Sequence, residues 1–424
     1  MTQAMALIDG NNFYAACEQN LNPSLSGRPV VVLSNNDGCI VARSPEARGL
    51  GISMGQPYFK VRHELKRLGV VVCSSNYALY GDMSHRLMSL LEKHCEQLEV
   101  YSIDEAFAQI HRPHDWDLRP WARQLRALIH QNIGLPIAIG IGSSKVQAKL
   151  ANHIAKTISI HAGVFDLDIT KNQDFWLKTI EIENVWGIGR QMARWCRMKG
   201  INTAQQLRDM PSNELHAKFG VRGIRLQNEL RGKICLPLKM IPPPKQQTCV
   251  SRSFSRPVTS LKELHQVVSS HVIRASEKLR KQKQRAGAIT VFTRTSPFSK
   301  PFYKQSATTQ LNIPSNDTSV LLKASLGLTK QIFQPYHLLI KAGVLMQKLQ
   351  STDHLQSSLL DPYNSEDRQR RERLMKTIDK LNEHYGNGTM SWAAGALKQG
   401  WEMRHERMSS AMTTQTTRIP IVHS

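Results

Sequence analysis

The sequence has no long apolar stretch. Nowhere do eighteen apolar residues run together, whereas a transmembrane helix needs about 20. The first residues carry no basic region and only a five-residue apolar run, so they do not have the pattern of a secretory signal. We therefore expect a soluble chain that is not exported.

The sequence also lacks paired cysteines. Its 7 cysteines are an odd number, with no CxxC pair and no nearby histidine at zinc-binding spacing. This pattern excludes a disulfide framework and a structural zinc site. It predicts a reducing compartment, which for a chain that is not exported is the cytoplasm.

Acidic residues are scarce beside basic ones. The chain has 33 Asp and Glu against 56 Lys and Arg, which gives a formal net charge of +23. A surplus of this size predicts attraction to a polyanion, with nucleic acid ahead of an anionic membrane surface. The content of 41% apolar and 21% charged residues excludes a disordered chain, and the length of 424 residues allows several domains.

Periodicity in the first part of the chain indicates strands that alternate with helices. Apolar runs bounded by turn residues predict strands, and apolar spacing with a Ser143-Ser144 cap predicts helices. The expected strands cover 5–9, 28–33, 100–107 and 137–142, and the expected helices cover 87–98 and the residues after Ser144. This order predicts an α+β sheet domain that extends to about residue 165.

The composition changes further along the chain. Glycines between short helical stretches over 184–208 indicate paired helices with tight turns, and Pro242-Pro243-Pro244 indicates a linker. Residues 245–300 then contain twelve Lys and Arg against two Glu, a ratio typical of a surface that faces a polyanion. The polar segments 348–375 and 409–424 are predicted to be flexible.

Three acidic residues stand out in this basic chain. Asp9 ends a predicted strand, and Asp104 and Glu105 lie next to each other within another. Taken alone, the three acids are most simply surface residues beside Lys or Arg. If the strands are neighbours, the carboxylates share one pocket and suit a pair of Mg²⁺ ions. Adjacent residues of a regular strand point to opposite faces, so Asp104 and Glu105 then need a local bend.

Several motifs follow one another in order along the chain. They are LIDGNNFYAACE (7–18), RPVVVLSNNDGCIVARSPEARGLG (28–51), SSNYALYGDMSHR (74–86), YSIDEAF (101–107), GIGSSKVQAKLANHIAK (140–156), VWGIG (185–189), SRSF (251–254) and RTSPF (294–298). In these motifs the chain resembles Y-family translesion DNA polymerases, and among them most closely the UmuC-type catalytic subunit of bacterial DNA polymerase V. The resemblance extends from about residue 5 to residue 410.

The resemblance implies roles for individual residues. Asp9, Asp104 and Glu105, with the backbone carbonyl of Gly10, correspond to the ligands of two Mg²⁺ ions. Tyr14 corresponds to the steric gate, whose ring excludes a ribose 2′-OH.

Other positions of the motifs correspond to residues that contact the substrates. Arg48 and Lys156 match positions that bind the incoming triphosphate, although Pro45 stands where many relatives have a phosphate-contacting side chain. Ile40 and Val41 correspond to residues that cover the nascent base pair.

The resemblance also implies DNA contacts and partners. Gly187 and Gly189 match a helix-hairpin-helix turn that binds the DNA backbone, and the basic 245–300 segment matches the little-finger domain. Gln356, Leu359 and Leu360 occupy the place of a sliding-clamp peptide. The implied partners are primer-template DNA, dNTP, a processed UmuD-type dimer, the recombinase filament and the clamp, with no membrane.

Together these features predict an α+β multidomain, right-hand-like polymerase. We expect a palm over 1–165 with fingers inserted at about 20–75, a thumb over 166–240, a little finger over 241–348 and a tail over 349–424. The implied function is error-prone translesion synthesis in the SOS response, in the nucleoid-associated cytoplasm. Two alternatives remain open, a non-catalytic DNA-binding checkpoint scaffold and a two-metal cyclase or nuclease built on the same acids.

Overall fold

The computed structural model describes residues 2–113, 116–170, 172–352, 365–386, 388–395, 400–401 and 403–410. The chain divides into two compact units, which are described separately. Unit 1 comprises Met1–Pro242 and Glu406–Ser424, and unit 2 comprises Pro243–His405. The first junction lies in the run of three prolines.

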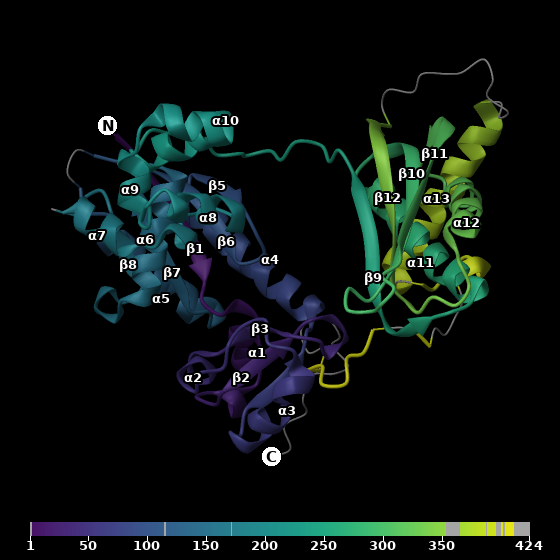
Figure 1. Cartoon of the computed structure of the whole chain (residues 1–424), viewed down its shortest axis with the longest axis horizontal. Coiled ribbons are helices and arrows are strands. Elements are labelled where there is room, and N and C mark those ends of the chain that lie inside the picture. Colours follow the sequence, from purple (N-terminus) through teal and green to yellow (C-terminus); the bar gives the residue numbers. More distant parts are fainter. Residues whose placement is uncertain are drawn as a thin grey trace. The chain divides into compact units, whose positions relative to one another are not determined.

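A five-stranded sheet forms the centre of unit 1 (Figure 1). Its order is β5 (Gln97–Val100), β6 (Glu105–Arg112), β1 (Thr2–Gly10), β7 (Ile137–Gly142) and β8 (Val164–Asp166). The central strand β1 is antiparallel to both β6 and β7, and β8 is parallel to β7. Because β1 has neighbours on both sides, residues at its end lie beside the ends of two other strands.

Alternation along β1 places helices on both faces of this sheet. Ala4, Ala6 and Ile8 share one apolar core with α1 (Phe13–Leu21), α4 (Tyr77–His94) and α5 (Arg119–Ile133). Met5 and Leu7 point to the other face, where α6 (Lys145–Thr157) lies. Asp9 has the same parity as Met5 and Leu7, so its side chain is on the face of α6.

Ser144 fixes where α6 begins, because its side chain accepts a hydrogen bond from the Gln147 N–H, as the predicted cap requires. Val146, Leu150 and Ile154 form the buried stripe of this helix.

A second, three-stranded sheet lies between α1 and α4 in the sequence. Its order is β3 (Ile40–Arg43), β2 (Val30–Leu33) and β4 (Val71–Ser74). The short helices around it are η1 (Pro23–Leu25), η2 (Asn35–Asp37), α2 (Pro45–Gly49) and α3 (Tyr58–Arg67). β4 forms one edge of this sheet.

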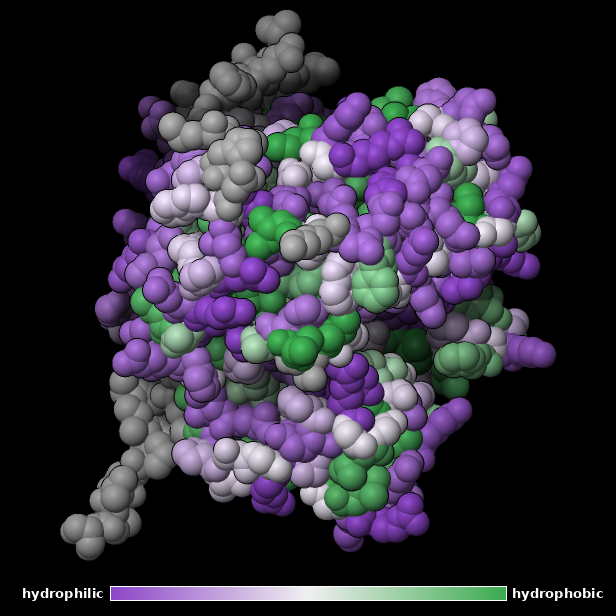
Figure 2. Space-filling view, turned by 90° about the vertical axis from the view of Figure 1, so that its left-hand side faces the viewer, coloured by the Kyte–Doolittle hydropathy of each residue, from purple (hydrophilic) through white to green (hydrophobic). Residues whose placement is uncertain are grey.

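Short helices follow β8 and share a core with α6. They are α7 (Gln173–Thr179), η4 (Ile182–Asn184), α8 (Arg190–Met198), α9 (Ala204–Asp209) and α10 (Ser212–Leu230), preceded by η3 (Ser159–His161) before β8. Figure 2 shows a face on which hydrophilic residues predominate and hydrophobic residues form only small separate areas. Among the described helices of the chain, none is long and apolar enough to cross a bilayer.

Unit 2 contains a four-stranded antiparallel sheet with helices on one side (Figure 1). The strands, in spatial order, are β11 (Lys304–Ser315), β10 (Gln284–Thr295), β12 (Leu339–Ser351) and β9 (Thr248–Val258). The helices are α11 (Leu261–Lys281), α12 (Thr318–Ile332) and α13 (Ser365–Tyr385), followed by η5 (Ala393–Gly395). Arg280 holds α13 through two hydrogen bonds to Asp379, of 2.6 and 2.7 Å.

The predicted α+β multidomain fold is confirmed, but several predictions about individual segments are wrong. Residues 100–107 form no single strand, because β5 ends at Val100 and β6 begins at Glu105. The helix expected to reach residue 98 ends at His94, and Leu98 lies in β5. The segment predicted to be flexible over 348–375 contains the end of β12, to Ser351, and the start of α13, at Ser365.

Candidate active site

The central sheet brings the acidic residues to one edge. Asp9 and Glu105 are directly opposite each other in the β1–β6 register. The Gly10 N–H donates a 2.9 Å hydrogen bond to the carbonyl of Asp104. Residues nearly one hundred positions apart are therefore held together by the backbone of the two central strands.

A tight bend separates the adjacent acids. Ser102 accepts hydrogen bonds from the N–H groups of Asp104 and Glu105, at 3.3 and 3.1 Å. The Ser102 hydroxyl also donates to the Asp104 carboxylate at 2.6 Å. Asp104 thus precedes the strand and Glu105 begins it, and this bend removes the geometric objection to a shared site.

Two lysines of α6 form ion pairs with two of these acids. Lys156 forms a 2.6 Å ion pair with Asp9, and Lys149 forms a 3.0 Å ion pair with Glu105. Burial raises the pKa of Asp9 to about 7, although Lys156 opposes the shift. Among the described residues, no three His, Cys, Asp or Glu side chains are grouped closely enough to hold a metal ion as they stand. The backbones of β1 and β6 thus bring the acids together, and the carboxylates of Asp9 and Glu105 are paired with lysine ammonium groups.

Lys149 was not predicted from the sequence. It lies seven residues before Lys156, which is about two helical turns, so both lysines are on the same side of α6. Its ammonium also lies 4.7 Å from the ring centroid of Tyr101 and 5.4 Å from that of Trp186. The seven-residue spacing was the available signal, but it identifies a site only once the helix is known to cover the acids.

Arg48 and Lys156 line the same cavity of about 740 Å³. Its wall also includes Asn11 and Asn12 after β1, Pro45 and Glu46 of α2, and Arg126 of α5. Arg48 is exposed and has no ion pair in the described part of the chain. A hollow with three cationic side chains beside the acidic edge can accommodate an anionic ligand. Pro45 offers it no donor.

Tyr14 lies in a cluster of three tyrosines near the acidic edge. Its ring stacks on Tyr80 at a centroid distance of 4.4 Å and an angle of 14°. Tyr77 approaches it edge-on at 6.2 Å. Burial raises the pKa of Tyr14, with smaller contributions from Tyr77 and Asp104.

Ile40 and Val41 belong to β3 and do not line this cavity. Ile40 is 1% exposed and packs in the core of the three-stranded sheet. Val41 is half-buried against the larger core of unit 1. In this structure the side chain of Ile40 therefore packs in the core of the three-stranded sheet.

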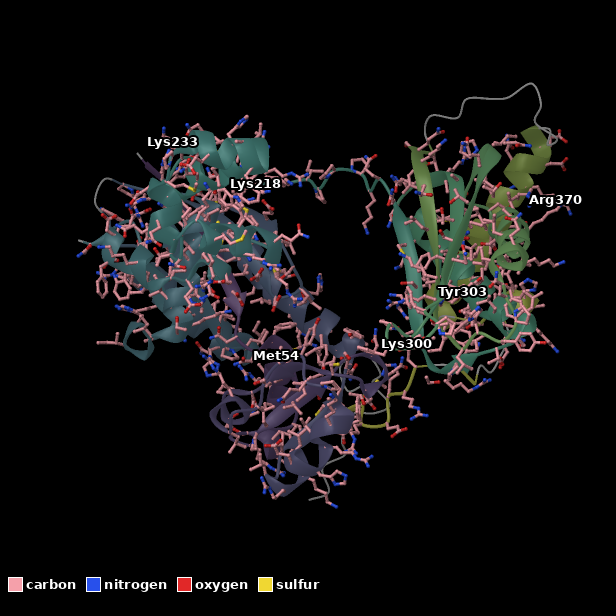
Figure 3. The ribbon with its side chains drawn as sticks, in the orientation of Figure 1. Met54, Lys218, Lys233, Lys300, Tyr303 and Arg370 are labelled. Atoms are coloured by element: carbon pink, nitrogen blue, oxygen red, sulfur yellow. The ribbon has the colours of Figure 1, made fainter. Side chains whose placement is uncertain are left out.

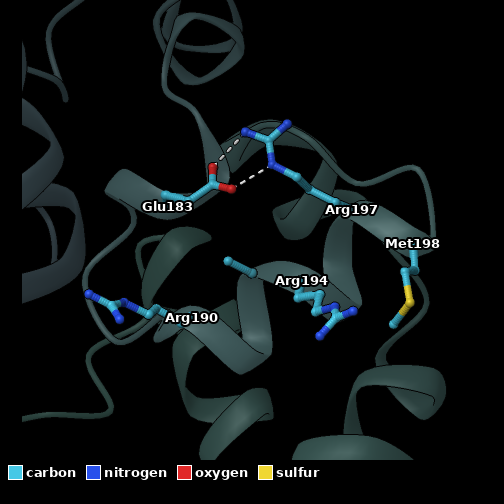
Figure 4. Close-up of a pocket in the computed structure, with 6 residues that line it drawn as sticks. Glu183, Arg190, Arg194, Arg197 and Met198 are labelled. Carbon is cyan, nitrogen blue, oxygen red and sulfur yellow. Dashed lines mark hydrogen bonds and ion pairs between the residues drawn. The ribbon is translucent and has the colours of Figure 1, made fainter. Parts of the chain in front are cut away.

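Gly187 and Gly189 form a turn before α8. Gly187 has a φ of +94°, a conformation that favours glycine, and the Gly189 carbonyl accepts the Ala193 N–H at 2.9 Å. Arg190, Arg194 and Met198 line an adjacent hollow of about 540 Å³ (Figure 4). Arg197 pairs with Glu183 at 2.7 Å, whereas Arg190 and Arg194 have no ion pair in the described ranges.

In unit 2, the sheet face opposite α11 and α12 carries a row of basic residues. Val291 of β10 and Val344 of β12 pair with each other, and both pack in the core under the helices. Side chains alternate between the two faces of a strand, so Arg294, Lys304 and Lys341 lie on the face without helices. Arg294 is directly opposite Lys304 on one side and Lys341 on the other. None of the three has an ion pair among the residues that the structure describes. We call these three residues the basic row.

Further lysines are exposed in both units. Lys218 and Lys233 lie on α10 and just after it, and Lys300 lies in the loop between β10 and β11 (Figure 3). Within the basic 245–300 segment, however, Arg256, Arg274, Arg280, Lys281 and Arg285 form ion pairs with nearby acids. The excess of positive charge is thus only partly available to an external polyanion. Gln356, Leu359 and Leu360 lie outside the described residues.

Comparison with known families gives three matches along the chain. Residues 8–153 match the impB/mucB/samB family, and residues 245–359 match the impB/mucB/samB family C-terminal domain. Residues 372–422 match a domain of unknown function, DUF4113.

The chain is also similar to individual proteins along its length. It is 40% identical over 414 residues to Protein UmuC of Salmonella typhimurium strain LT2, which covers 97% of this chain and 98% of that one. It is 39% identical over 420 residues to Protein SamB of Salmonella typhimurium, covering 98% of each. Among solved structures, the Y-family DNA polymerase chimera Dbh-Dpo4(243-245)-Dbh aligns with a TM-score of 0.64 and 21% identity, over 82% of this chain and 99% of that one.

Proposed function

Because this chain belongs to the impB/mucB/samB family and has the fold of Y-family DNA polymerases, we propose that it is a DNA-directed DNA polymerase. It adds dNTP to a primer 3′-hydroxyl on a DNA template, copies past lesions and makes errors, as part of the SOS response to DNA damage. The observation that carries the proposal is the pairing of Asp9 with Glu105 beside Asp104 at the edge of the central sheet.

The donor set at this edge fits hard divalent cations. Three carboxylates and the Gly10 carbonyl are oxygen ligands of the kind that Mg²⁺ prefers. Burial makes the charge of Asp9 costly, and a bound cation offsets that cost. We propose that Asp9, Gly10, Asp104 and Glu105 hold two Mg²⁺ ions, which when bound polarise the attacking hydroxyl and stabilise the leaving pyrophosphate.

The remaining residues position the substrates. Arg48 and Lys156 line one cavity, which supports their role in binding the triphosphate. With a cation bound to Asp9, the Lys156 ammonium would be free to contact the triphosphate. Tyr14 lies in the first turn of α1, five residues after Asp9, which supports its role as the gate against the ribose 2′-OH. Because Pro45 has no donor, the phosphates are left to the cationic side chains of Arg48, Arg126 and Lys156.

The DNA contacts come from two regions. The turn at Gly187 and Gly189 leads into α8, where the guanidinium groups of Arg190 and Arg194 are suited to binding a phosphate. The basic row of unit 2 places like charges directly opposite each other, which destabilises a sheet unless a polyanion covers it. We propose that this face contacts the phosphates of the duplex and reads no base sequence.

The proposed partners follow from the family. A processed UmuD-type dimer, the recombinase filament and the sliding clamp are expected, the last through Gln356, Leu359 and Leu360, in the nucleoid-associated cytoplasm. The reaction implies a soluble, DNA-bound enzyme.

Primer extension on a template with an abasic site tests the function. We expect the purified chain, supplied with the accessory dimer and recombinase filament, to insert dNTP opposite the lesion when Mg²⁺ is present. Asp104→Asn should abolish insertion but leave DNA binding intact. If lesion-dependent mutagenesis in cells survives Asp104→Asn, the chain acts as a non-catalytic scaffold instead.

A further inference from the structure

The end of the described chain returns to unit 1. Residues 406–410, which we call the return segment, lie within the match to the domain of unknown function. The Ser74 N–H donates to the Arg407 carbonyl, and the Arg407 N–H donates to the Ser74 hydroxyl, each at 3.0 Å. Asn76 donates to the Ser409 hydroxyl at 3.0 Å. The return segment is thus bound at the end of β4, an edge strand, and at the start of α4.

Ser409 of the return segment also contacts a buried carboxylate, which has no role in the proposed reaction. Glu18 of α1 is 2% exposed, and one of its oxygens accepts from the Tyr80 hydroxyl at 2.7 Å and from the Ser409 hydroxyl at 3.3 Å. In the part of the chain that the structure describes, Glu18 has no ion pair. A buried carboxylate depends strongly on such donors, because an unsatisfied one is costly.

The ring of Tyr14 stacks on the same Tyr80. Tyr80 is fully buried, and the two rings are nearly parallel at 4.4 Å. Tyr77 packs edge-on against both rings, at 6.2 Å from each. The position of Tyr14 is therefore set by a chain of contacts from Ser409 to Glu18, then to Tyr80, and finally to Tyr14.

We propose that Tyr80, Glu18 and Ser409 are positioning residues for sugar selection by Tyr14. The inference rests on the proposed function, since it assigns a support to the gate of that reaction. Steric exclusion rises steeply as a ring approaches the 2′ position, so a small displacement of Tyr14 changes the selection against ribonucleotides more than it changes dNTP insertion. By this route the return segment, almost four hundred residues from Tyr14 in the sequence, contributes to substrate specificity.

The test measures kcat/KM for dNTP and for the matching rNTP with the full chain in primer extension. Ser409→Ala should raise the ratio of rNTP to dNTP use about five-fold, the equivalent of one hydrogen bond. Tyr80→Leu, which removes the stacked ring, should raise it about three- to ten-fold. Ser409→Thr keeps the hydroxyl and should restore the original ratio. Ser410→Ala, at an exposed neighbouring position, is the matched control and should leave the ratio unchanged.

Combination with Tyr14→Ala separates a positioning role from a general loss of structure. On that background Ser409→Ala should have no further effect on sugar selection, because the ring it positions is absent. Equal ratios for wild type, Ser409→Ala and Tyr80→Leu, each still inserting dNTP, would overturn the inference and leave the proposed function standing. No dNTP insertion by the wild type with its accessory proteins would instead overturn the proposed function. Melting temperatures of the variants check that each remains folded.

Discussion

His271 on α11 is a buried imidazole, and we expect it to make the stability of unit 2 depend on pH. It is 3% exposed, packs 6.2 Å from Trp401, and its Nε2 has no hydrogen-bond partner in the described structure. Burial, with a smaller contribution from Arg252, lowers its pKa from 6.5 to about 4. The unfolded chain therefore takes up this proton first as the pH falls, and the folded state loses stability between pH 6.5 and 4.

We expect the free energy of unfolding of unit 2 to be on the order of 2 kcal/mol lower at pH 5 than at pH 7 because of this residue. His271→Gln should remove most of that difference, whereas His384→Gln, at an exposed position of α13, should retain it. Hydrogen exchange of α11 at the two pH values measures the effect in the whole chain. Equal pH dependence in wild type and His271→Gln would contradict the assignment.

At the residue scale, the sequence motifs identified most of the candidate site but not how it is held together. Asp9, Asp104 and Glu105 were found from their motifs, and the need for a bend between the last two followed from strand geometry. Glu18 and Lys149 were missed. A buried glutamate in a helix and a lysine on a helix face look ordinary until the tertiary structure places Tyr80 and Glu105 beside them.

At the scale of elements, α6 packs closely on β7 because Gly140 and Gly142 present no side chains to the helix. A Cβ on Gly140 of β7 would lie 2.0 Å from the Asn152 nitrogen and 2.4 Å from the Ala148 oxygen. Helix and strand are thus in direct backbone contact, which Asn152 reinforces by donating to the Ala138 carbonyl at 3.0 Å. The alternating glycines of IAIGIG permit this approach.

Gly140→Ala should therefore destabilise unit 1 by about 3 kcal/mol or more, because neither backbone can yield without moving the helix. It should also weaken dNTP binding, since α6 carries Lys156. Gly81→Ala in α4 is the matched control, because its added methyl group meets nothing within 4 Å. That change should be neutral or stabilise by up to about 1 kcal/mol. Urea unfolding of both variants measures the contrast, and similar stabilities would contradict the packing argument.

The basic row makes a second prediction at this scale. Arg294→Gln and Lys341→Gln should each weaken DNA binding for every sequence and reduce the slope of log K against log salt by about 0.9. Arg274→Gln is the control, because Arg274 lies on α11 and is already paired with Glu277 at 2.9 Å. Fluorescence anisotropy of labelled primer-template over a salt series gives the slopes. An equal loss of slope in Arg274→Gln would mean that total charge matters and the face does not.

The elements themselves were largely predictable where a local signal exists. The strand at 137–142 and the start of α6 follow from an apolar run and a serine cap. The predicted helix up to residue 98 failed because Leu98 continues the helical spacing of α4 but pairs in β5 with Ala108. That pairing is set by a strand ten residues further along, and a local pattern does not contain it.

At the scale of the whole molecule, the link between the units begins at a fixed point. The buried pair of Lys145 and Glu99 holds the chain before the prolines: Lys145 donates to the Pro237 carbonyl at 3.0 Å, and the Lys239 N–H donates to Glu99 at 2.7 Å. Residues 240–247 that follow are exposed. The freely exposed link therefore starts only after Lys239, although the helical part of unit 1 ends at Leu230.

Glu99→Ala should lengthen this link, because it leaves Lys145 buried without its partner and removes the acceptor of Lys239. Loss of one member of a buried ion pair costs about 3 to 5 kcal/mol, enough to release the segment locally. Trypsin should then cut after Lys239 several times faster than in the wild type. Glu96→Ala, which removes an exposed partner of His111, should cut at the wild-type rate. If both variants resist trypsin equally, Lys145 and Glu99 do not control where unit 1 ends, and the exposed link begins elsewhere.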